Sequence, residues 1–430
     1  MTPHSPSASS SPHPHPKPCP PLPPSPSSAA APAVSHSRGS SRAQESTTSS
    51  LSRDDSPDPK DHHAGGSLDL HTTTGIAALD AAGLRAEFDK LARYEAAVFT
   101  VQDAQGGNRY RARAGEGDEQ RPEIDRVQLR KILVDSIPKE RIRWGKTLKS
   151  VVRDEGDGEG EKGWVLKFAD GTQETGFRMV VGADGASSAV RPLITLAKPR
   201  YSGKTYIEGR ITPSNPQYAA ALEMVGPGNS AAIGAGRALL LQQMSDRSYR
   251  AYIGIEEADT SLTRPGGILD FATDIEKSRT TILEKYYADW APHLRAFIEN
   301  AEAPFRVWPI HTLDAAVFAP EAQWTRAPGV TLLGDAAHVA TTNGDGVNLA
   351  MLDALKLFEA LTAELGKENA DDDAAVERAI VAYETEMRKR AREHIEDGIQ
   401  MSDVMFSADG AEKMIAFFKS FEEAREARES

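Results

Sequence analysis

The sequence predicts an α/β fold with a long C-terminal helix, and three segments carry this prediction. The first segment is residues 330–357, VTLLGDAAHVATTNGDGVNLAMLDALKL. It combines a short apolar run, a glycine-rich turn and a stretch with apolar residues at helical spacing. This is the pattern of a buried strand, a turn and a helix. Residues 179–191, MVVGADGASSAVR, again place a tight turn and a helix start after a strand. Residues 374–400 carry apolar side chains at helical spacing, which indicates a long amphipathic helix.

The turn in residues 330–357 has the chemistry of a ligand site. Asp335 follows the predicted strand, where its carboxylate can accept a hydrogen bond from a hydroxyl group. Gly344 and Gly346 allow a ligand to approach the backbone closely. The helix that opens near Gly346 presents unpaired N–H groups and a positive dipole end. The segment therefore predicts a site for a polar, electron-rich ligand, although an ordinary βα turn has the same order of elements.

Residues 179–191 form the second motif. Gly182-Ala183-Asp184-Gly185 makes the turn, and Asp-Gly after a strand is by itself a common hairpin or N-cap signal. Its occurrence in the same chain as residues 330–357 is what makes the motif informative.

The two motifs together resemble the FAD-dependent aromatic hydroxylases, also called class A flavoprotein monooxygenases. Residues 179–191 match the family pattern G-A-D-G-x-x-S-x-V-R at every fixed position, and residues 330–357 are similar to its second flavin signature. The matched positions of that signature are Gly334, Asp335, Ala336, Ala337, His338, Gly344, Gly346, Asn348, Ala350, Asp353 and Ala354. One position departs: Thr342 stands where the family usually has proline, which bears on the stiffness of the turn.

The resemblance implies a doubly wound, Rossmann-like FAD-binding domain with an inserted β-sheet substrate domain. It implies that Asp335, after Gly334, binds the ribityl chain and that the helix start at Gly346–Asn348 faces the N1 and C2-carbonyl edge of the flavin. It also implies that Asp184 lies beside the FAD pyrophosphate. His338 is then structural and not catalytic, and no side chain is expected to act as a catalytic residue.

Two weaker matches point to the tetracycline-inactivating branch of the family. Residues 121–138 have apolar side chains at helical spacing, with Arg126 and Arg130 one turn apart on the same face. In that branch two arginines at this spacing contact FAD, whereas taken alone such a pair is usually a solvated helix face. Residues 65–71, GGSLDLH, also resemble the branch and imply a flavin contact from Asp69.

The opening of such domains, a strand followed by a G-x-G-x-x-G turn and a helix, does not occur in the 430 residues; glycines with this spacing occur only at residues 158–163. Gly234-Ala235-Gly236 lacks the third glycine, and the glycines of residues 156–160 lie among acids. Residues 1–64 are instead rich in Pro, Ser and His, a composition that predicts disorder. Two hypotheses remain open: a truncated or misassembled monooxygenase with an N-terminally incomplete domain, or a genuine variant. Under either we expect FAD to be held poorly.

These observations divide the chain into five segments. We expect a disordered leader (1–64), a first part of the FAD-binding domain (65–198), a substrate-binding sheet domain (199–305), a second FAD-binding part (306–365) and a C-terminal helical region (366–430). Within the second segment, residues 75–97 suggest two helical pieces broken at Gly83, and residues 141–182 suggest antiparallel strands around an acidic tip. In the tetracycline branch the long helix of the last segment bridges the two domains; the alternative is a dimerisation helix.

Composition narrows the class of protein. The net charge of −13 disfavours a nucleic-acid partner, which needs a concentrated basic face. The single cysteine, Cys19, excludes a disulfide within the chain. No stretch reaches the roughly 20 apolar residues of a membrane span. His13, His15, His62 and His63 lie in the leader without a fold to fix metal geometry, so we expect no metal site, and we expect a cytoplasmic monomer.

The implied function is hydroxylation of an electron-rich aromatic or polyketide-like small molecule with FAD, NAD(P)H (NADPH in our expectation) and O2. The tetracycline branch binds its drug through polar side chains of the sheet domain, and the corresponding stretches here hold Glu208 and Ser230, so we expect another substrate. The alternative is a non-enzymatic or inactive remnant that binds a partner through the sheet or through its Pro-rich leader, whose segments resemble ligands of SH3-type domains.

Overall fold

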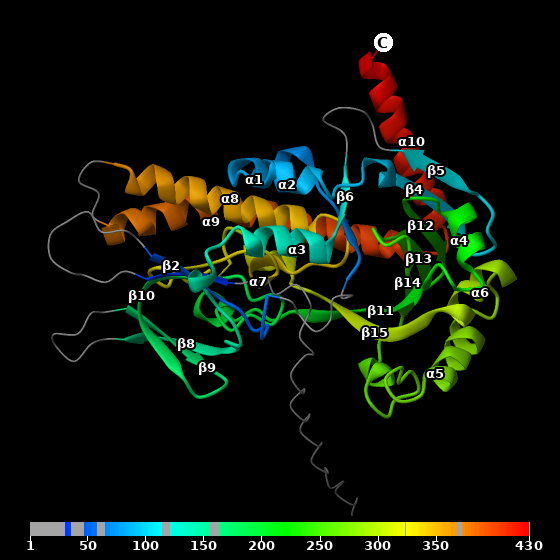
Figure 1. Ribbon diagram of the computed structural model, residues 1–430, viewed down its shortest axis with the longest axis horizontal. Coiled ribbons are helices and arrows are strands. Elements are labelled where there is room, and N and C mark those ends of the chain that lie inside the picture. Colours follow the sequence, from blue (N-terminus) through cyan, green and yellow to red (C-terminus); the bar gives the residue numbers. More distant parts are fainter. Residues whose placement is uncertain are drawn as a thin grey trace, which may run out of the picture.

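The computed structural model describes residues 31–35, 47–57, 65–113, 121–154, 163–322, 324–367 and 372–429. The described elements form two seven-stranded sheets, one two-stranded ribbon and a layer of helices that includes α8 and α9 (Figure 1). This mixed α/β architecture confirms the predicted fold class.

The first sheet has the strand order β7-β2-β1-β10-β9-β8, and β16 also pairs with β10. Its strands are β1 (Ala31–Ser35), β2 (Thr47–Leu51), β7 (Ile142–Arg143), β8 (Leu148–Asp154), β9 (Gly163–Phe168), β10 (Gln173–Gly182) and β16 (Val330–Leu332). The antiparallel strands predicted for residues 141–182 are confirmed as β8, β9 and β10. The acidic tip between β8 and β9 lies outside the described residues.

Two strands of this sheet come from the segment predicted to be a disordered leader. β1 pairs antiparallel with β10, with Ala33 opposite Val180, and β2 pairs with β1. The prediction of disorder over all of residues 1–64 is therefore wrong for these two strands. Strand pairing forms hydrogen bonds between backbone N–H and C=O groups and does not depend on which side chains are present. A segment without a recognisable strand pattern can therefore pair with the edge of β10. The leader histidines and Cys19 lie outside the described residues.

The second sheet has the order β15-β11-β14-β13-β12-β4-β5. Its strands are β4 (Val98–Asp103), β5 (Tyr110–Arg113), β11 (Arg200–Ile211), β12 (Asn229–Gly234), β13 (Arg237–Gln243), β14 (Tyr249–Glu256) and β15 (Glu302–Thr312). An apolar cluster on one face joins Ile207 and Ile253 of the sheet to Leu294 and Phe297 of a helix. The helices near this face are α4 (Tyr218–Met224), α5 (Ile275–Thr281) and α6 (Pro292–Asn300) (Figure 1).

The membership of this second sheet differs from the predicted domain boundaries. β4 and β5 come from the segment assigned to the FAD-binding domain, and β15 continues past residue 305. β4 joins the sheet by parallel pairing with β12, where Phe99 lies opposite Asn229. Nothing in the local sequence of a strand specifies which of two sheets it enters, so the boundary was set by pairing partners far along the chain.

A short ribbon connects the two sheets. β3 (Ser67–Asp69) pairs antiparallel with β6 (Glu123–Asp125), and α3 (Arg126–Asp135) begins directly after β6. Asp125 caps α3 in a capping box with Gln128, which explains where the predicted helix of residues 121–138 starts. The two helical pieces predicted for residues 75–97 are confirmed as α1 (Ala77–Ala81) and α2 (Arg85–Asp89), separated at Gly83, whose φ is +70°.

The remaining helices are α7 (Asp335–His338), α8 (Gly346–Leu365), α9 (Asp372–Met405) and α10 (Gly410–Glu429). Short 3-10 turns occur at Tyr94–Ala96, Lys139–Arg141, Arg191–Leu193, Thr260–Thr263 and Ala315–Phe318, and π-helical turns at Thr72–Ile76 and Ile282–Tyr286. No helix in the described ranges is long and apolar enough to cross a membrane.

The long helix α9 confirms the predicted amphipathic helix and connects the two halves of the molecule. Ile380, Tyr383 and Met387 are buried in the apolar core of the first sheet. Met405, at the other end of α9, belongs to the cluster under the second sheet that contains Tyr206. Other parts of the same chain thus cover the apolar face of α9. The helix therefore matches the bridging helix implied by the family resemblance and not the alternative of a dimerisation helix.

Candidate functional site

The two predicted turns lie side by side at one edge of the first sheet. β10 and β16 run parallel, with Val180 opposite Val330 and Gly182 opposite Leu332. The pairing continues one step further, because the Leu333 amide donates to the Gly182 carbonyl oxygen at 2.8 Å. Ligands of open α/β sheets bind outside the carboxyl ends of such strands. The turns that follow these two strands therefore share one binding edge.

Arg191 joins the two turns through hydrogen bonds to backbone carbonyl groups. Its Nη1 donates to Ala186 O at 2.7 Å, next to the first turn. Its Nε donates to Ala336 O at 2.7 Å and its Nη2 to Asp335 O at 2.8 Å, in the second. Burial lowers the pKa of Arg191 to about 10, and the charges of Asp184 and Asp335 oppose that shift. The side chain thus stays cationic at neutral pH and fixes the spacing of the turns.

Asp184 has an oxygen suited to a ligand. Its Oδ2 accepts from the Ala189 amide at 2.7 Å. Its Oδ1 is buried and has no hydrogen-bond partner among the described residues. A buried acceptor without a partner costs free energy until a donor reaches it. The unpaired oxygen of Asp184 therefore fits a hydroxyl or N–H group of a molecule bound at this edge.

The fully buried side chain of Asp353 stabilises the turn at Gly334. Asp353 Oδ2 accepts from the Gly334 amide at 3.1 Å and lies 2.6 Å from His338 Nε2. Its Oδ1 pairs with Arg390 Nη2 of α9 at 3.1 Å. This network agrees with the structural role expected of His338. The contribution of Arg390 was not predicted, because helical spacing alone does not reveal a partner on another helix.

Asn348 links the start of α8 to the segment after β3. Its Oδ1 accepts from the His71 amide at 2.9 Å and from Thr74 Oγ1 at 3.1 Å, and its Nδ2 donates to the Asp69 carbonyl oxygen at 2.9 Å. A Cβ at Gly75 would lie 2.7 Å from Asn348 Oδ1. The structure thus brings two predicted site residues, Asn348 and Asp69, together. The amide of Asn348 is engaged within the protein, so it acts by positioning the two segments.

Open space surrounds the glycines of the second turn. A Cβ at Gly344 or Gly346 would meet no atom within 4 Å, and Gly344 has a φ of +91°. α8 begins at Gly346, so its first N–H groups, free of intrahelical partners, lie at this open position. The second turn thus offers an exposed helix start and a half-buried Asp335, and the first turn offers the unpaired oxygen of Asp184.

The two predicted arginines have different surroundings. Arg126 begins α3, and its Nε is buried without a hydrogen-bond partner in the described ranges. Arg130 is paired: its Nη2 lies 2.8 Å from Asp54 Oδ2 and its Nη1 donates to Pro57 O at 2.5 Å. The structure thus places Arg130 with residues 47–57, a partner that no sequence pattern predicts because Asp54 lies in the predicted leader.

One face of the second sheet contacts the second turn and the short strand β3. Tyr206 interacts with Thr342 of the second turn, and Gln242 exchanges two hydrogen bonds with the backbone of Ser67 in β3. Glu208 lies on the same face of β11 as Tyr206, two residues further along. This face therefore contacts both segments that carry predicted flavin residues.

The most buried ion pair of this face is formed by Glu208 and Arg250, which are 4% and 3% exposed and lie 3.3 Å apart. Trp308 Nε1 donates to the second Glu208 oxygen at 2.9 Å. Burial raises the pKa of Glu208, while Trp308 and Arg250 act in the opposite direction. A carboxylate has lone pairs left after one bond to each oxygen, so Glu208 can accept a further donor. Ser230, the other residue singled out from the sequence, is buried in β12.

A second buried acid, Glu123, lies where the ribbon meets the second sheet. Asn229 Nδ2 donates to its Oε1, and Arg93 Nη2 lies 3.6 Å from its Oε2. Burial raises the pKa of Glu123 to about 7, against the lowering effect of Ser67, Asn229 and Arg93. The charge state of this junction therefore changes near neutral pH. No sequence motif points to Glu123, because it lies in a short strand.

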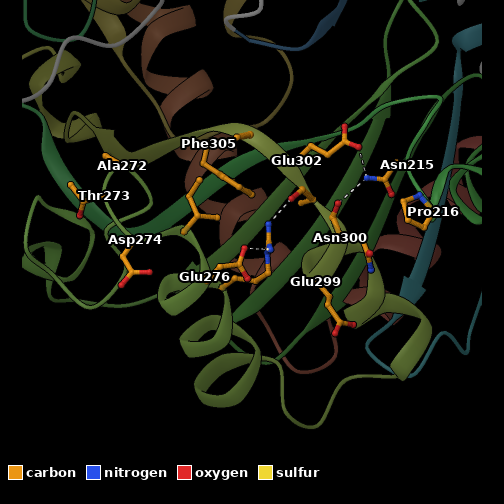
Figure 2. Close-up of a pocket in the computed structure, with 14 residues that line it drawn as sticks. Asn215, Pro216, Ala272, Thr273, Asp274, Glu276, Glu299, Asn300, Glu302 and Phe305 are labelled. Atoms are coloured by element: carbon orange, nitrogen blue, oxygen red, sulfur yellow. Dashed lines mark hydrogen bonds and ion pairs between the residues drawn. The ribbon is translucent and has the colours of Figure 1, made fainter.

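A pocket of about 720 Å³ lies elsewhere, between α5, α6 and β15 (Figure 2). Two of its acidic side chains have partners within the pocket: Glu302 accepts from Asn215, and Glu276 accepts from Arg279. Phe305, which also lines it, packs against the helix-covered face of the second sheet. The pocket includes none of the predicted flavin residues, and its polar groups hold together the local fold.

Comparison with known proteins finds similarity to an FAD binding domain and to monooxygenases. Residues 269–397 match the family model described as FAD binding domain, which includes the second turn and most of α9. The chain is 28% identical over 382 residues to the monooxygenase penA of Penicillium thymicola, covering 81% of this chain and 87% of that protein.

Solved structures show the same fold. HpxO of Klebsiella pneumoniae, complexed with FAD and uric acid, has 20% identity and a TM-score of 0.63, with 84% of each chain covered. The tetracycline destructase Tet(51) has 16% identity and a TM-score of 0.56, covering 86% of this chain and 90% of that one. Both sequence motifs lie at one sheet edge, and the chain is similar in sequence to a monooxygenase and to an FAD binding domain, and in fold to a protein solved with FAD.

Proposed function

We propose that this chain is an FAD-dependent monooxygenase that uses NAD(P)H and O2, with NADPH as the expected donor, to hydroxylate an electron-rich aromatic or polyketide-like small molecule. The observation that carries the proposal is the parallel pairing of β10 with β16, which brings the Asp184 and Asp335 turns to one edge. Arg191 then fixes those turns to each other. Both turns are held by buried contacts within the protein.

In this proposal the two turns, the start of α8 and the segment after β3 each contribute to flavin binding. Asp335 accepts hydrogen bonds from the ribityl hydroxyl groups, and the α8 start stabilises negative charge at the N1 and C2-carbonyl edge of the ring. Asn348 positions Asp69 and the His71 segment against that helix start. When bound, the flavin supplies the hydride acceptance and oxygen activation of the reaction. No side-chain nucleophile is required.

The second sheet supplies the substrate wall. The aromatic side chains of Tyr206 and Trp308 lie on the same face of the sheet as Glu208. This face contacts the second turn, so the buried Glu208 carboxylate lies on the side of the sheet nearer the proposed flavin site. An aromatic ring stacks or packs against such side chains, and a hydroxyl or N–H substituent finds an acceptor in Glu208. These features favour a planar substrate with at least one hydrogen-bond donor. Among proteins of similar fold, HpxO was solved with uric acid.

The test is turnover with added FAD. Purified protein is mixed with FAD and NADPH, and consumption of NADPH and O2 is followed with a panel of phenols, N-heteroaromatics and polyketides, with the oxygenated product identified by mass spectrometry. We expect at least one compound to accelerate NADPH consumption and to gain one oxygen atom, and Asp335→Ala to abolish the acceleration. Flavin binding without any oxygenated product would instead favour the inactive remnant, and absence of flavin binding would refute the proposed site.

A further inference from the structure

Residues 341–345, the part of the second turn that leads into α8, are contacted by residues far away in the sequence. Thr342 stands there where the family usually has proline, so no ring fixes the backbone at this position. Tyr206 of β11 interacts with Thr342. The residues on either side, Thr341 and Asn343, lie against α9. The conformation of this part of the turn therefore depends on tertiary contacts.

Two residues of α9, one helical turn apart, make the contacts from that helix. Gly398 lets α9 approach closely, since a Cβ there would lie 3.0 Å from both the carbonyl oxygen and Oγ1 of Thr341. His394, four residues earlier on the same face, has its Nδ1 3.2 Å from Asn343 Nδ2. The residue is 8% exposed, and its ring lies edge-on to that of His338 with the centroids 5.7 Å apart.

The partners of Asn343 determine which nitrogen of His394 carries the proton. Asn343 Oδ1 accepts from the Asp345 amide at 3.1 Å, which fixes the orientation of the side-chain amide. The Nδ2 group of Asn343 therefore donates to His394 Nδ1, and this nitrogen has a lone pair and no proton. The imidazole is then neutral, with its proton on Nε2. Asn343 in turn holds the amide of Asp345, the residue directly before α8.

The surroundings of His394 favour the neutral ring. Burial lowers the pKa of His394 to about 4, and His338 acts in the same direction. Asp335 and Asp353 oppose the shift. Asp353 is itself paired with Arg390 of α9 at 3.1 Å. At neutral pH His394 Nδ1 is therefore a hydrogen-bond acceptor, and it loses its lone pair only when acid protonates the ring.

We propose that His394 is a positioning residue for the second turn: its unprotonated Nδ1 holds Asn343, and thereby the backbone that leads into α8. In the proposed function the start of α8 faces the flavin ring, so His394 also sets where those N–H groups meet the flavin. The flavin part of this inference rests on the proposed function, whereas the tautomer of His394 and its contact with Asn343 do not.

Nitrogen-15 NMR of the flavin-free full chain, labelled at histidine, tests the contact directly. The His394 signals are identified by their loss in His394→Asn. We expect the proton on Nε2 at pH 7, and a ring that is still about 90% neutral at pH 5. A proton on Nδ1 at pH 7, or protonation of the ring at the ordinary pKa of 6.5, would overturn the inference.

Two variants separate positioning from packing. His394→Asn keeps an oxygen close to the place of Nδ1, whereas His394→Leu fills a similar volume and has no acceptor. Both variants lose the ring contact with His338, so that loss cancels in the comparison. We expect FAD to bind about three- to tenfold more weakly to His394→Leu than to His394→Asn in calorimetric titration at pH 7, the effect of one hydrogen bond.

Glu393→Ala, an exposed neighbour on α9, is the control and should leave FAD affinity unchanged. Equal affinity in His394→Asn and His394→Leu would mean that the histidine only fills space, and would overturn the inference while leaving the proposed function intact. If the unaltered chain binds no FAD, the proposed function fails, and the NMR experiment by itself decides whether His394 Nδ1 holds Asn343.

Discussion

Arg191 donates a hydrogen bond from Nη2 to the carbonyl oxygen of Asp335 at 2.8 Å, across 144 positions of sequence. The same guanidinium group binds Ala186 O beside the first turn. One buried cation thus sets the distance between two motifs that are far apart in the chain. The relative position of the two turns therefore depends on Arg191.

Replacing Arg191 should therefore damage both stability and cofactor binding. Arg191→Lys keeps the positive charge but loses the planar guanidinium group with its several N–H donors. Some of the buried carbonyl oxygens therefore lose their hydrogen-bond donors. We expect unfolding free energy to fall by at least about 2 kcal/mol, from the cost of unpaired buried acceptors. Urea unfolding measures this. Arg392→Lys is the control, because Arg392 is half exposed on α9; an equal loss in both variants would argue against the linking role of Arg191.

Asp335 should matter for binding and little for folding. Asp335→Ala removes one charged hydrogen-bond acceptor, which is worth about 1.5–3 kcal/mol, so flavin affinity should fall about 10- to 100-fold. The melting temperature of the flavin-free protein should fall only slightly, through loss of the Asp335 charge near the buried Arg191 guanidinium. Calorimetric titration and thermal unfolding separate the two effects. A large drop in melting temperature with unchanged affinity would assign Asp335 to the fold.

Two glycines offer a matched pair of alanine substitutions. At Gly75 the new Cβ would lie 2.7 Å from Asn348 Oδ1, so Gly75→Ala should destabilise the fold by about 1–3 kcal/mol through overpacking. At Gly346 the new Cβ meets nothing within 4 Å, so Gly346→Ala should leave stability nearly unchanged. Flavin affinity should fall in both variants, since Gly346 lies where the ligand approaches the backbone. Intact flavin binding in Gly346→Ala would place the ring elsewhere.

Glu123 should make stability depend on pH. Its pKa is about 7 in the folded chain against a reference of 4.5, so the folded state binds this proton more tightly. The resulting stabilisation is complete below pH 4.5 and is lost as pH rises through 7, and it amounts to about 3 kcal/mol at most. Glu123→Gln should remove this contribution. Urea unfolding of both proteins at pH 5 and pH 8 tests it: identical pH dependence would contradict the assignment.

The Glu208–Arg250 pair should show strong coupling. Arg250→Met leaves a buried carboxylate without its cation, and breaking such a pair costs about 3–5 kcal/mol. Combining it with Glu208→Leu removes both charges, so the double variant should be more stable than the sum of the two single effects predicts. A double-mutant cycle measured by urea unfolding gives the coupling energy. Additive effects would mean that the two side chains are stabilised independently.

The sequence by itself determined the elements that carry the site. The apolar runs before Gly182 and Gly334 specify β10 and β16, and the glycines after them specify turns, because backbone conformation there depends on neighbouring residues. The apolar spacing of α9 likewise follows from a helix having 3.6 residues per turn. Each of these signals is local, which is why these particular strands, turns and helices were predictable.

The tertiary structure decided which groups meet. The bonds from Arg191 to Asp335, from Asn348 to Asp69 and from Asp353 to Arg390 join residues on different elements. The entry of β1 and β2 into the first sheet was equally unpredictable, because strand pairing through backbone groups leaves no side-chain pattern. A motif specifies a turn, but the partner of a buried charge is whichever group the folded chain brings within about 3 Å of it.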